Sequence, residues 1–377
     1  MTRTRAGDAA FVETPGLSDL ARHEAAWRDL AARAAEPNVF AEAAFLIPAL
    51  THLAPRGVAT LLVWADAGRA RLIGIAAIEH SAARVGLARI WRSEQAALGA
   101  LLVDSEAAEE ALAAILAWTG SHGAAGLRLP FLVMQGPIAA AVAALAERRS
   151  LPLVILDRRQ RAALPVGPAA SFETALDKKR RKEWARQRRR LSDRGRLDTQ
   201  SLEAAGGVEA FLALEARGWK GARGTALVQD EARASFTRDM LTRFAAQGAL
   251  RAAALTLDGA PIAAGLALRS GARGFYWKTA YDERFAEYSP GLLLTLDLSR
   301  RLEREDGLAL VDSCAAPKHP MIDRLWPARL DLVDLALAVR SEAARRFALA
   351  LGVARLREQA RERLKSLANR LLRRKVS

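Results

Sequence analysis

The 377-residue sequence predicts an α/β (α+β) fold made of two similar modules and a basic helical tail. Two observations predict it. Each half of the chain shows the same order of expected elements: helix, antiparallel hairpin, longer strand, helix, strand, helix, strand. Each hairpin also contains a tight-turn sequence, Asp66-Ala67-Gly68 in the first half and Asp258-Gly259 in the second. The length of the chain also favours two modules, because a single hydrophobic core rarely extends over more than about 300 residues.

The first module is expected over residues 1–165. An alanine-rich helix over 17–35 ends at Pro37, and two strands flank the first tight turn. Ser105 is the expected N-cap of a second helix. In chain order, the elements expected after the first helix are strands at 59–65, 71–79 and 90–92, a helix over 105–121, a strand at 126–130, a helix over 137–149 and a strand at 153–157.

The second module is expected over residues 166–340, with the seam between Pro165 and Pro168. Sequence identity between the halves is negligible, so the repeat is one of element order, and a single intertwined domain is the alternative. Its expected elements are helices at 171–191 and 207–217, strands at 250–257, 261–269 and 275–281, a helix at 290–305, and strands at 308–314 and 330–339.

The net charge of +15 is concentrated in two segments. Residues 178–196 hold eleven Lys/Arg against two acidic residues, and residues 340–377 hold twelve against three. The rest of the chain is slightly acidic, which excludes a generally basic, nucleic-acid-coating body.

The cysteine count and the hydropathy pattern indicate a cytoplasmic protein. A single cysteine, Cys314, excludes a disulfide framework and a cysteine-rich zinc site, and the five histidines show no metal-ligand spacing. The first 16 residues lack the apolar core of a secretory signal. No window approaches the roughly 18 apolar residues of a membrane span.

The tail, residues 341–377, carries one apolar stripe opposite a face of arginine and lysine. This pattern allows two interpretations: the helix packs on the body, or it lies in the interface of an anionic membrane, which would make the protein peripheral to the inner face. The stripe consists of Leu349, Val353, Leu356, Ala360, Leu364, Leu367 and Leu371.

The stretch from Gly274 to Leu298 carries the clearest functional signal. An aromatic-rich strand is followed by a charged loop and by a helix that starts at Ser289-Pro290-Gly291. Ser289 can cap this helix, Pro290 suits its first turn, and Gly291 lets a ligand approach the free N–H groups. A helix N-terminus of this kind binds anions, typically phosphate. The alternative is a well-capped helix without a ligand.

The order hairpin, strand, phosphate-ready helix, strand resembles the GNAT acyltransferase module. YWKTAYDERFAEYSPGLLL (276–294) resembles the CelD/BcsL group of GNAT-like acetyltransferases, which are associated with cellulose and exopolysaccharide biosynthesis. LDKKRRKEWARQRRRLSDRG and FLALEARGWKGARGTAL agree in order and spacing, so the similarity covers about residues 165–340. In the first half only VWADAGRARLIGIAAI resembles the family. More distantly, the group resembles the FemAB peptidyltransferases, which are built from two GNAT modules.

The resemblance implies an acyl-CoA co-substrate and no metal. Its pyrophosphate would lie at Ser289, Pro290, Gly291 and Leu292, with Arg284 nearby. The common GNAT loop carries two spaced glycines after Arg or Gln, whereas only Gly291 is present here. This difference predicts a narrower phosphate cradle. The first module offers only Gly99 at the corresponding place, so we expect that module to be structural.

Acyl transfer needs a base for the acceptor and an acid for the leaving thiolate. Glu215, just before the sequence Gly218-Trp219-Lys220-Gly221, is the first candidate base; otherwise it is a solvated glutamate at a helix end. Asp312, at the end of a strand, is the second candidate, with a turn cap as the alternative. Tyr281 is the candidate acid.

Four further residues are candidates for substrate contact. Trp219 and Lys220 lie in a glycine-rich loop, which suits a sugar or acyl contact. Lys278 lies three residues before Tyr281 on one strand, so the two side chains are expected on opposite faces. Lys318 follows Asp312 in a loop and could contact phosphate.

The leading hypothesis is therefore a CelD-like tandem-GNAT acyltransferase that acetylates or acylates a hydroxyl or amine of a saccharide or envelope precursor. Direct attack is expected, because no activated nucleophile stands out. A FemAB-like aminoacyltransferase using charged tRNA is the first alternative and would explain the basic segment 178–196. A non-catalytic accessory protein of polysaccharide export is the second.

Overall fold

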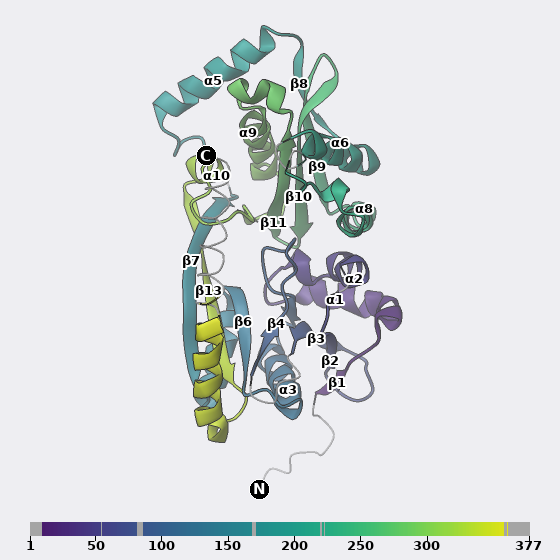
Figure 1. The fold of residues 1–377 in the computed structure, drawn as a ribbon, viewed down its shortest axis with the longest axis vertical. Helices are drawn as coiled ribbons and strands as arrows, with labels where there is room; N and C mark the ends of the chain where they lie inside the picture. Colours follow the sequence, from purple (N-terminus) through teal and green to yellow (C-terminus); the bar gives the residue numbers. More distant parts are fainter. Residues whose placement is uncertain are drawn as a thin grey trace.

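The computed structural model describes residues 10–53, 55–80, 86–167, 171–218, 221, 223–357 and 360. A single mixed sheet of thirteen strands runs through this part of the chain, with helices packed on both faces (Figure 1). The neighbouring strands follow the order β1-β2-β3-β4-β6-β13-β7-β12-β11-β10-β9-β8, and β5 pairs with β3 beside this path. The predicted α/β fold with a large mixed sheet flanked by helices is confirmed.

The bounds of the elements are as follows. The strands are β1 (Phe11–Glu13), β2 (Val58–Trp64), β3 (Leu72–Glu79), β4 (Leu87–Ile90), β5 (Leu101–Val103), β6 (Gly126–Val133), β7 (Leu153–Pro165), β8 (Leu197–Ser201), β9 (Leu250–Leu257), β10 (Ala260–Ser270), β11 (Arg273–Tyr281), β12 (Leu310–Asp312) and β13 (Ala328–Ala338). The α-helices are α1 (Glu24–Arg33), α2 (Ala43–His52), α3 (Ala108–Ser121), α4 (Pro137–Arg148), α5 (Lys178–Ser192), α6 (Ala204–Arg217), α8 (Glu231–Ala246), α9 (Pro290–Glu303) and α10 (Ile322–Leu325). The 3-10 helices are η1 (Leu17–His23), η2 (Val39–Ala41), η3 (Leu227–Gln229), η4 (Glu283–Tyr288) and η5 (Ser341–Ala343).

The two halves of the chain exchange strands at the middle of the sheet. β13, from the second half, lies between β6 and β7 of the first, and β7 lies between β13 and β12. β7 and β13 pair antiparallel from Leu153↔Leu337 to Ala163↔Ala328. Each half therefore completes the sheet of the other. The boundary between two modules at residues 165/166 stays a prediction.

The hydrophobic core on one face of the sheet is shared by both halves. Residues of α1, α2, α6 and α8 belong to one buried cluster. Within it, Phe40 lies edge-on to Phe275 with ring centroids 5.4 Å apart, and Phe45 lies edge-on to Phe236 at 5.3 Å. Each of these contacts joins a first-half ring to a second-half ring. The other face carries two clusters, one under α3 and α4 and one under α5 and α9.

Several element boundaries differ from the sequence-based expectation. α3 begins at Ala108 with Ala107 at the N-cap, so Ser105 is not the cap. α5 begins only at Lys178, where the Asp177 side chain accepts a hydrogen bond from the Lys179 amide. α2 was not expected, because it contains Pro48 and is buried on all sides, which leaves no helical periodicity in its sequence. The long helix α8 and the short strands β1, β5 and β8 were also not expected.

None of the helices in the described part of the chain combines the length and the apolar character required to cross a bilayer.

Candidate active site

Two adjacent parallel strands, β11 and β12, separate after three residue pairs. The pairs are Arg273↔Leu310, Gly274↔Val311 and Phe275↔Asp312. β12 ends there, whereas β11 continues to Tyr281 and remains paired with β10 on its other side. Among the described residues, no strand covers the β12-facing edge of 276–281. That edge therefore presents backbone donors and acceptors to an opening within the sheet.

A β-bulge changes the direction of β11 at this opening. Lys278 is paired with Leu266 and Tyr276 with Ala267, which makes Trp277 the extra residue. The Trp277 indole N–H donates to the Gln95 carbonyl at 2.9 Å, so the bulge is held against a loop of the first half. The Lys278 ammonium lies 5.0 Å from the Trp277 ring centroid. The Lys278 side chain thus lies beside the Trp277 ring on one face of β11, while the Tyr281 side chain packs against α9 on the other face.

The helix expected after β11 begins at Pro290, with Ser289 at its N-cap. Ser289 adopts a left-handed conformation (φ 52°, ψ 53°), and its side chain makes no capping hydrogen bond, so the expected hydroxyl cap is wrong. The amides of Leu292 and Leu293 both donate to the Ser289 carbonyl, at 3.0 and 3.1 Å. Within the described part of the chain, the Gly291 amide is the one first-turn donor left without a partner.

Gly291 is tightly packed inside the protein. A Cβ atom built on it would lie 3.1 Å from Tyr281 Cδ1 and 3.7 Å from Thr279 Cγ2. The sequence predicts that the missing side chain leaves room for a ligand, but on the Cβ side of Gly291 that room is taken by the Tyr281 ring. The close contact places the start of α9 against the end of β11.

A buried hydroxyl network fixes α9 on β11. Tyr276 Oη lies 2.8 Å from Thr295 Oγ1, and Thr279 Oγ1 donates to Tyr276 Oη. Thr295 in turn donates to the Gly291 carbonyl at 2.6 Å. Burial raises the pKa of Tyr276, so this phenol stays protonated. The sequence reading missed Thr279 and Thr295, whose roles appear only once strand and helix are packed together.

Arg284 pairs with a buried carboxylate next to the site. Its Nε and terminal nitrogen donate to Asp282 at 3.0 and 2.6 Å. These charge-assisted hydrogen bonds hold the pKa of Asp282 below its usual range. The rest of the guanidinium is exposed, so Arg284 is available to a second anion at the surface.

Asp312 is fully buried at the point where β11 and β12 separate. One of its oxygens forms an ion pair with Arg161 of β7, which is also buried. The other oxygen accepts from the Cys314 amide at 2.9 Å. Arg161 donates in addition to the Ala97 carbonyl at 3.0 Å. The hydrogen bond from Cys314 is the turn cap that the sequence offered as the alternative role for Asp312. The ion pair with Arg161 is an additional contact that the sequence could not indicate. A catalytic role for Asp312 stays a prediction.

Glu215 is buried on α6 and is therefore not a solvated helix-end residue. Its Oε2 accepts a hydrogen bond from the Leu227 amide at 2.8 Å, which ties the end of α6 to η3. The neighbouring Gly218 lies against the Tyr281 carbonyl, because a Cβ built on it would be 3.7 Å away. Glu215 thus lies close in sequence to a residue that contacts the β11 edge, and its role as base stays a prediction.

The remaining candidates divide into two groups. Trp219 and Lys220 lie outside the described residues. Lys318 is exposed in the loop after β12, in a left-handed conformation with φ 61°. The structure therefore brings Tyr281 against the start of α9, pairs Arg284 with the neighbouring Asp282, and places Asp312 at the end of β12 with Lys318 in the loop that follows.

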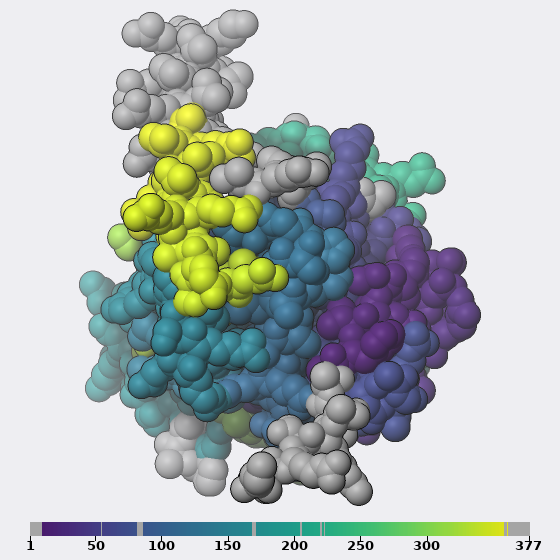
Figure 2. Space-filling model, turned by 90° about the horizontal axis from the view of Figure 1, so that it is seen from below, coloured from purple at the N-terminus to yellow at the C-terminus, as the bar shows by residue number. Residues whose placement is uncertain are grey.

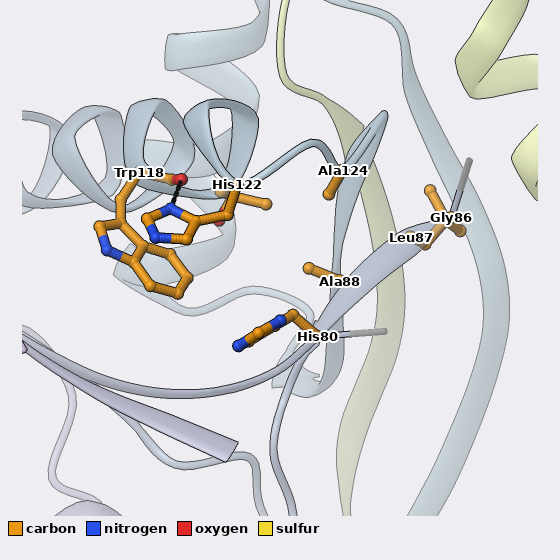
Figure 3. Close-up of a pocket in the computed structure, with 8 residues that line it drawn as sticks. His80, Gly86, Leu87, Ala88, Trp118, His122 and Ala124 are labelled. Atoms are coloured by element: carbon orange, nitrogen blue, oxygen red, sulfur yellow. Dashed lines mark hydrogen bonds between the residues drawn. The ribbon is translucent and has the colours of Figure 1, made fainter. Parts of the chain in front are cut away.

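Two cavities border the first half. A cleft of about 380 Å³ includes Trp91, Ser93 and Asp230 in its lining, and the Glu94–Arg233 ion pair (2.8 Å) links the two halves across it. A cavity of about 10 Å³ lies beside Trp118 and His122, whose rings stack at 3.9 Å (Figure 3). The second cavity holds about one water molecule and is too small for a substrate.

Residues 178–319 match the model of a family described as an acetyltransferase (GNAT) domain. No curated protein sequence matches the chain. Among solved structures, FemX is similar with a TM-score of 0.56 at 11% identity, covering 88% of this chain and 98% of that one.

A second similar structure is the C-terminal (DUF2156) domain of a protein described as a lysylphosphatidylglycerol synthetase from Agrobacterium fabrum. It has a TM-score of 0.51 at 13% identity and covers 87% of this chain and 94% of that one. A tandem GNAT protein from the clavulanic acid pathway matches at a TM-score of 0.41, with 19% identity and coverage of 88% and 98%. Residues 178–319 of the chain thus match a GNAT acetyltransferase domain.

Proposed function

We propose that this enzyme transfers an acetyl or related acyl group from acyl-CoA to a hydroxyl or amine of a saccharide or cell-envelope precursor in the cytoplasm. One observation carries the proposal. Within the GNAT-matching segment, the strand opening after Phe275 lies next to a helix N-terminus that packs on the same strand. The resemblance of residues 276–294 to the CelD/BcsL group supports a role in exopolysaccharide or cellulose biosynthesis.

The geometry suits an elongated donor that carries both amides and phosphates. An extended amide-bearing arm can pair with the free edge of β11 as an added strand does. A backbone N–H at the Trp277 bulge can then hold the thioester oxygen. The free Gly291 amide, the α9 dipole and the exposed part of Arg284 favour the pyrophosphate.

We propose direct attack by the acceptor on the thioester carbon. The acceptor loses its proton to a carboxylate, with Glu215 and Asp312 as the candidates. The C–S bond breaks, and the departing thiolate takes a proton from Tyr281. The cleft that contains Trp91 and the Glu94–Arg233 pair offers the acceptor a binding surface contributed by both halves.

We propose a structural role for the first module. Its parallel pair β4–β6 also extends over three residue pairs, but the chain after β4 turns through 93–99 and returns as β5 on β3. No helix begins there, so residues 93–99 provide no counterpart of the candidate anion site at the start of α9.

A second candidate function is aminoacyl transfer from charged tRNA, and α5 is the observation that favours it. The described residues provide no ion-pair partner for six exposed cations of this helix, which is the arrangement that binds a polyanion. They are Lys178, Lys179, Arg181, Lys182, Arg186 and Arg189.

Steady-state kinetics would test the proposal. Free thiol release from acetyl-CoA is measured with cellobiose, glucosamine and a UDP-linked amino sugar as acceptors. We expect acceptor-dependent release with intersecting initial-rate plots, because both substrates must be bound together. Absence of turnover with every thioester, together with tight and steeply salt-dependent binding of charged tRNA, would contradict acyl-CoA chemistry and favour the second candidate.

A further inference from the structure

The helix that follows η5, residues 344–357, has two apolar faces. Its inner face packs on the sheet through Phe347 and Leu351, which join Ala336 and Ala338 of β13 in a buried cluster. The Phe347 ring lies directly on the backbone of Gly126, where a Cβ atom would be 2.5 Å from the ring. One face of this helix thus makes the packing contacts with the body of the protein.

The outer face is apolar and exposed. Leu349 is 65% exposed, Val353 41% and Leu356 67%, and their spacing of four and three residues places them on one side of the helix. At about 100° per residue, this side points away from Phe347 and Leu351. The helix stands on the surface of the molecule (Figure 2, yellow). The helix therefore packs on the body, one of its two predicted interpretations, but it does so through Phe347 and Leu351 and leaves these three residues exposed.

Arginines flank the exposed stripe. Arg345, Arg355 and Arg357 are exposed and have no ion-pair partner among the described residues. Glu342 is the single acidic residue between 341 and 357. Exposed leucines between unpaired cations are the surface of an interfacial helix, whose side chains enter the acyl layer while its arginines contact lipid phosphates.

We propose that Leu349, Val353 and Leu356 dock this protein on an anionic lipid bilayer, with the helix in the membrane plane and the sheet behind it. A bilayer is favoured over a second copy of the chain, because pairing two such helices would bring their arginines face to face. In sequence, the stripe continues beyond the described helix at Leu364, Leu367 and Leu371. The proposal is independent of the acyl-transfer chemistry.

Vesicle sedimentation of the full-length protein tests the proposal. Vesicles of phosphatidylcholine alone are compared with vesicles containing about one-third phosphatidylglycerol, a content at which basic segments bind well. We expect the wild type to bind the anionic vesicles and to dissociate with added salt. Leu349→Ser/Val353→Ser/Leu356→Ser should lose binding at least tenfold. Arg345→Gln/Arg355→Gln/Arg357→Gln should lose the preference for anionic lipid.

The matched control is Leu17→Ser/Ile155→Ser/Val228→Ser, which removes three other exposed apolar side chains and should bind like the wild type. All of these residues are exposed, so unchanged thermal midpoints identify folded variants. Equal vesicle binding by the leucine variant and the wild type would overturn the proposal. A wild-type dimer that this variant converts to a monomer, without vesicle binding by either, would also overturn it and assign the stripe to self-association.

Discussion

Gly291 of α9 lies against Tyr281 of β11, so closely that a Cβ atom on Gly291 would be 3.1 Å from Tyr281 Cδ1. The contact joins the start of α9 to the end of β11, the strand that separates from β12. The candidate anion site and the strand opening are thereby held next to each other.

Replacing Gly291 should destabilise the protein through this contact. Gly291→Val adds branched atoms where even a Cβ is tight, and we expect a loss of roughly 1–3 kcal/mol in the free energy of unfolding. Tyr281→Ala should relieve the clash, so a double-mutant cycle measured by urea unfolding should show coupling of about 1 kcal/mol or more. Additive effects would contradict the packing role of Gly291.

The Arg161–Asp312 ion pair should dominate the stability of the strand opening. Asp312→Asn leaves the buried Arg161 charge without its counter-ion, which typically costs about 3 kcal/mol or more. Arg161→Met/Asp312→Leu removes both charges and should be less destabilised than the single variant. Denaturant unfolding of the wild type and the two variants checks this order of stability. A double variant less stable than Asp312→Asn would argue that loss of the ion pair does not cause the destabilisation.

Glu215→Gln separates a chemical role from a structural one. The amide oxygen can still accept from the Leu227 N–H, so the free energy of unfolding should change by less than about 1 kcal/mol. If Glu215 is the base, kcat/KM should fall by about 100-fold or more. Glu209→Gln on the exposed side of α6 is the control and should retain full activity. Full activity in Glu215→Gln would remove Glu215 from the mechanism.

Stability should fall as pH rises towards neutrality because of Glu42. Burial raises the pKa of this carboxyl from 4.5 to about 7, in spite of a hydrogen bond from Ser270. The folded protein therefore favours the protonated form. This contribution is fully present below about pH 4.5 and is lost as pH rises through about 7.

Glu42→Gln should abolish this dependence. Because glutamine stays neutral, the variant should exceed the wild type by roughly 3 kcal/mol at pH 8 and nearly match it at pH 4.5, a difference that urea unfolding at both pH values measures directly. Parallel pH profiles for the two proteins would show that Glu42 is not the group responsible.

The parts of the site that sequence predicts are those with local causes. Pro290 marks the start of α9 because proline suits the first turn of a helix, and Asp258-Gly259 marks a hairpin because its residues suit a tight turn. Arg161 could not be assigned to Asp312, because the two residues are 151 positions apart and meet only through the exchange of β7 and β13.

The tail shows a second limit of sequence reading. Leu349, Val353 and Leu356 belong to the longer periodic stripe, for which the sequence allows two partners, the body or a membrane. The face that actually packs is short and rests on the wide Phe347 ring, which fits because Gly126 has no side chain. Hydrophobic periodicity identifies an apolar face, but does not tell which partner covers it.

We expect the start of α9 to bind the phosphates of an acyl-CoA, and a thermal-shift titration with acetyl-CoA measures this binding. Ser289→Asp and Ser289→Asn form a matched pair: both residues tolerate the left-handed conformation and suit an N-cap, but only aspartate adds a negative charge. At about 100 times its dissociation constant, acetyl-CoA should stabilise the wild type and Ser289→Asn by about 2.7 kcal/mol. Ser289→Asp should fold equally well and lose this shift, because its carboxylate repels the phosphates. An equal shift in both variants, or none in the wild type, would contradict this expectation.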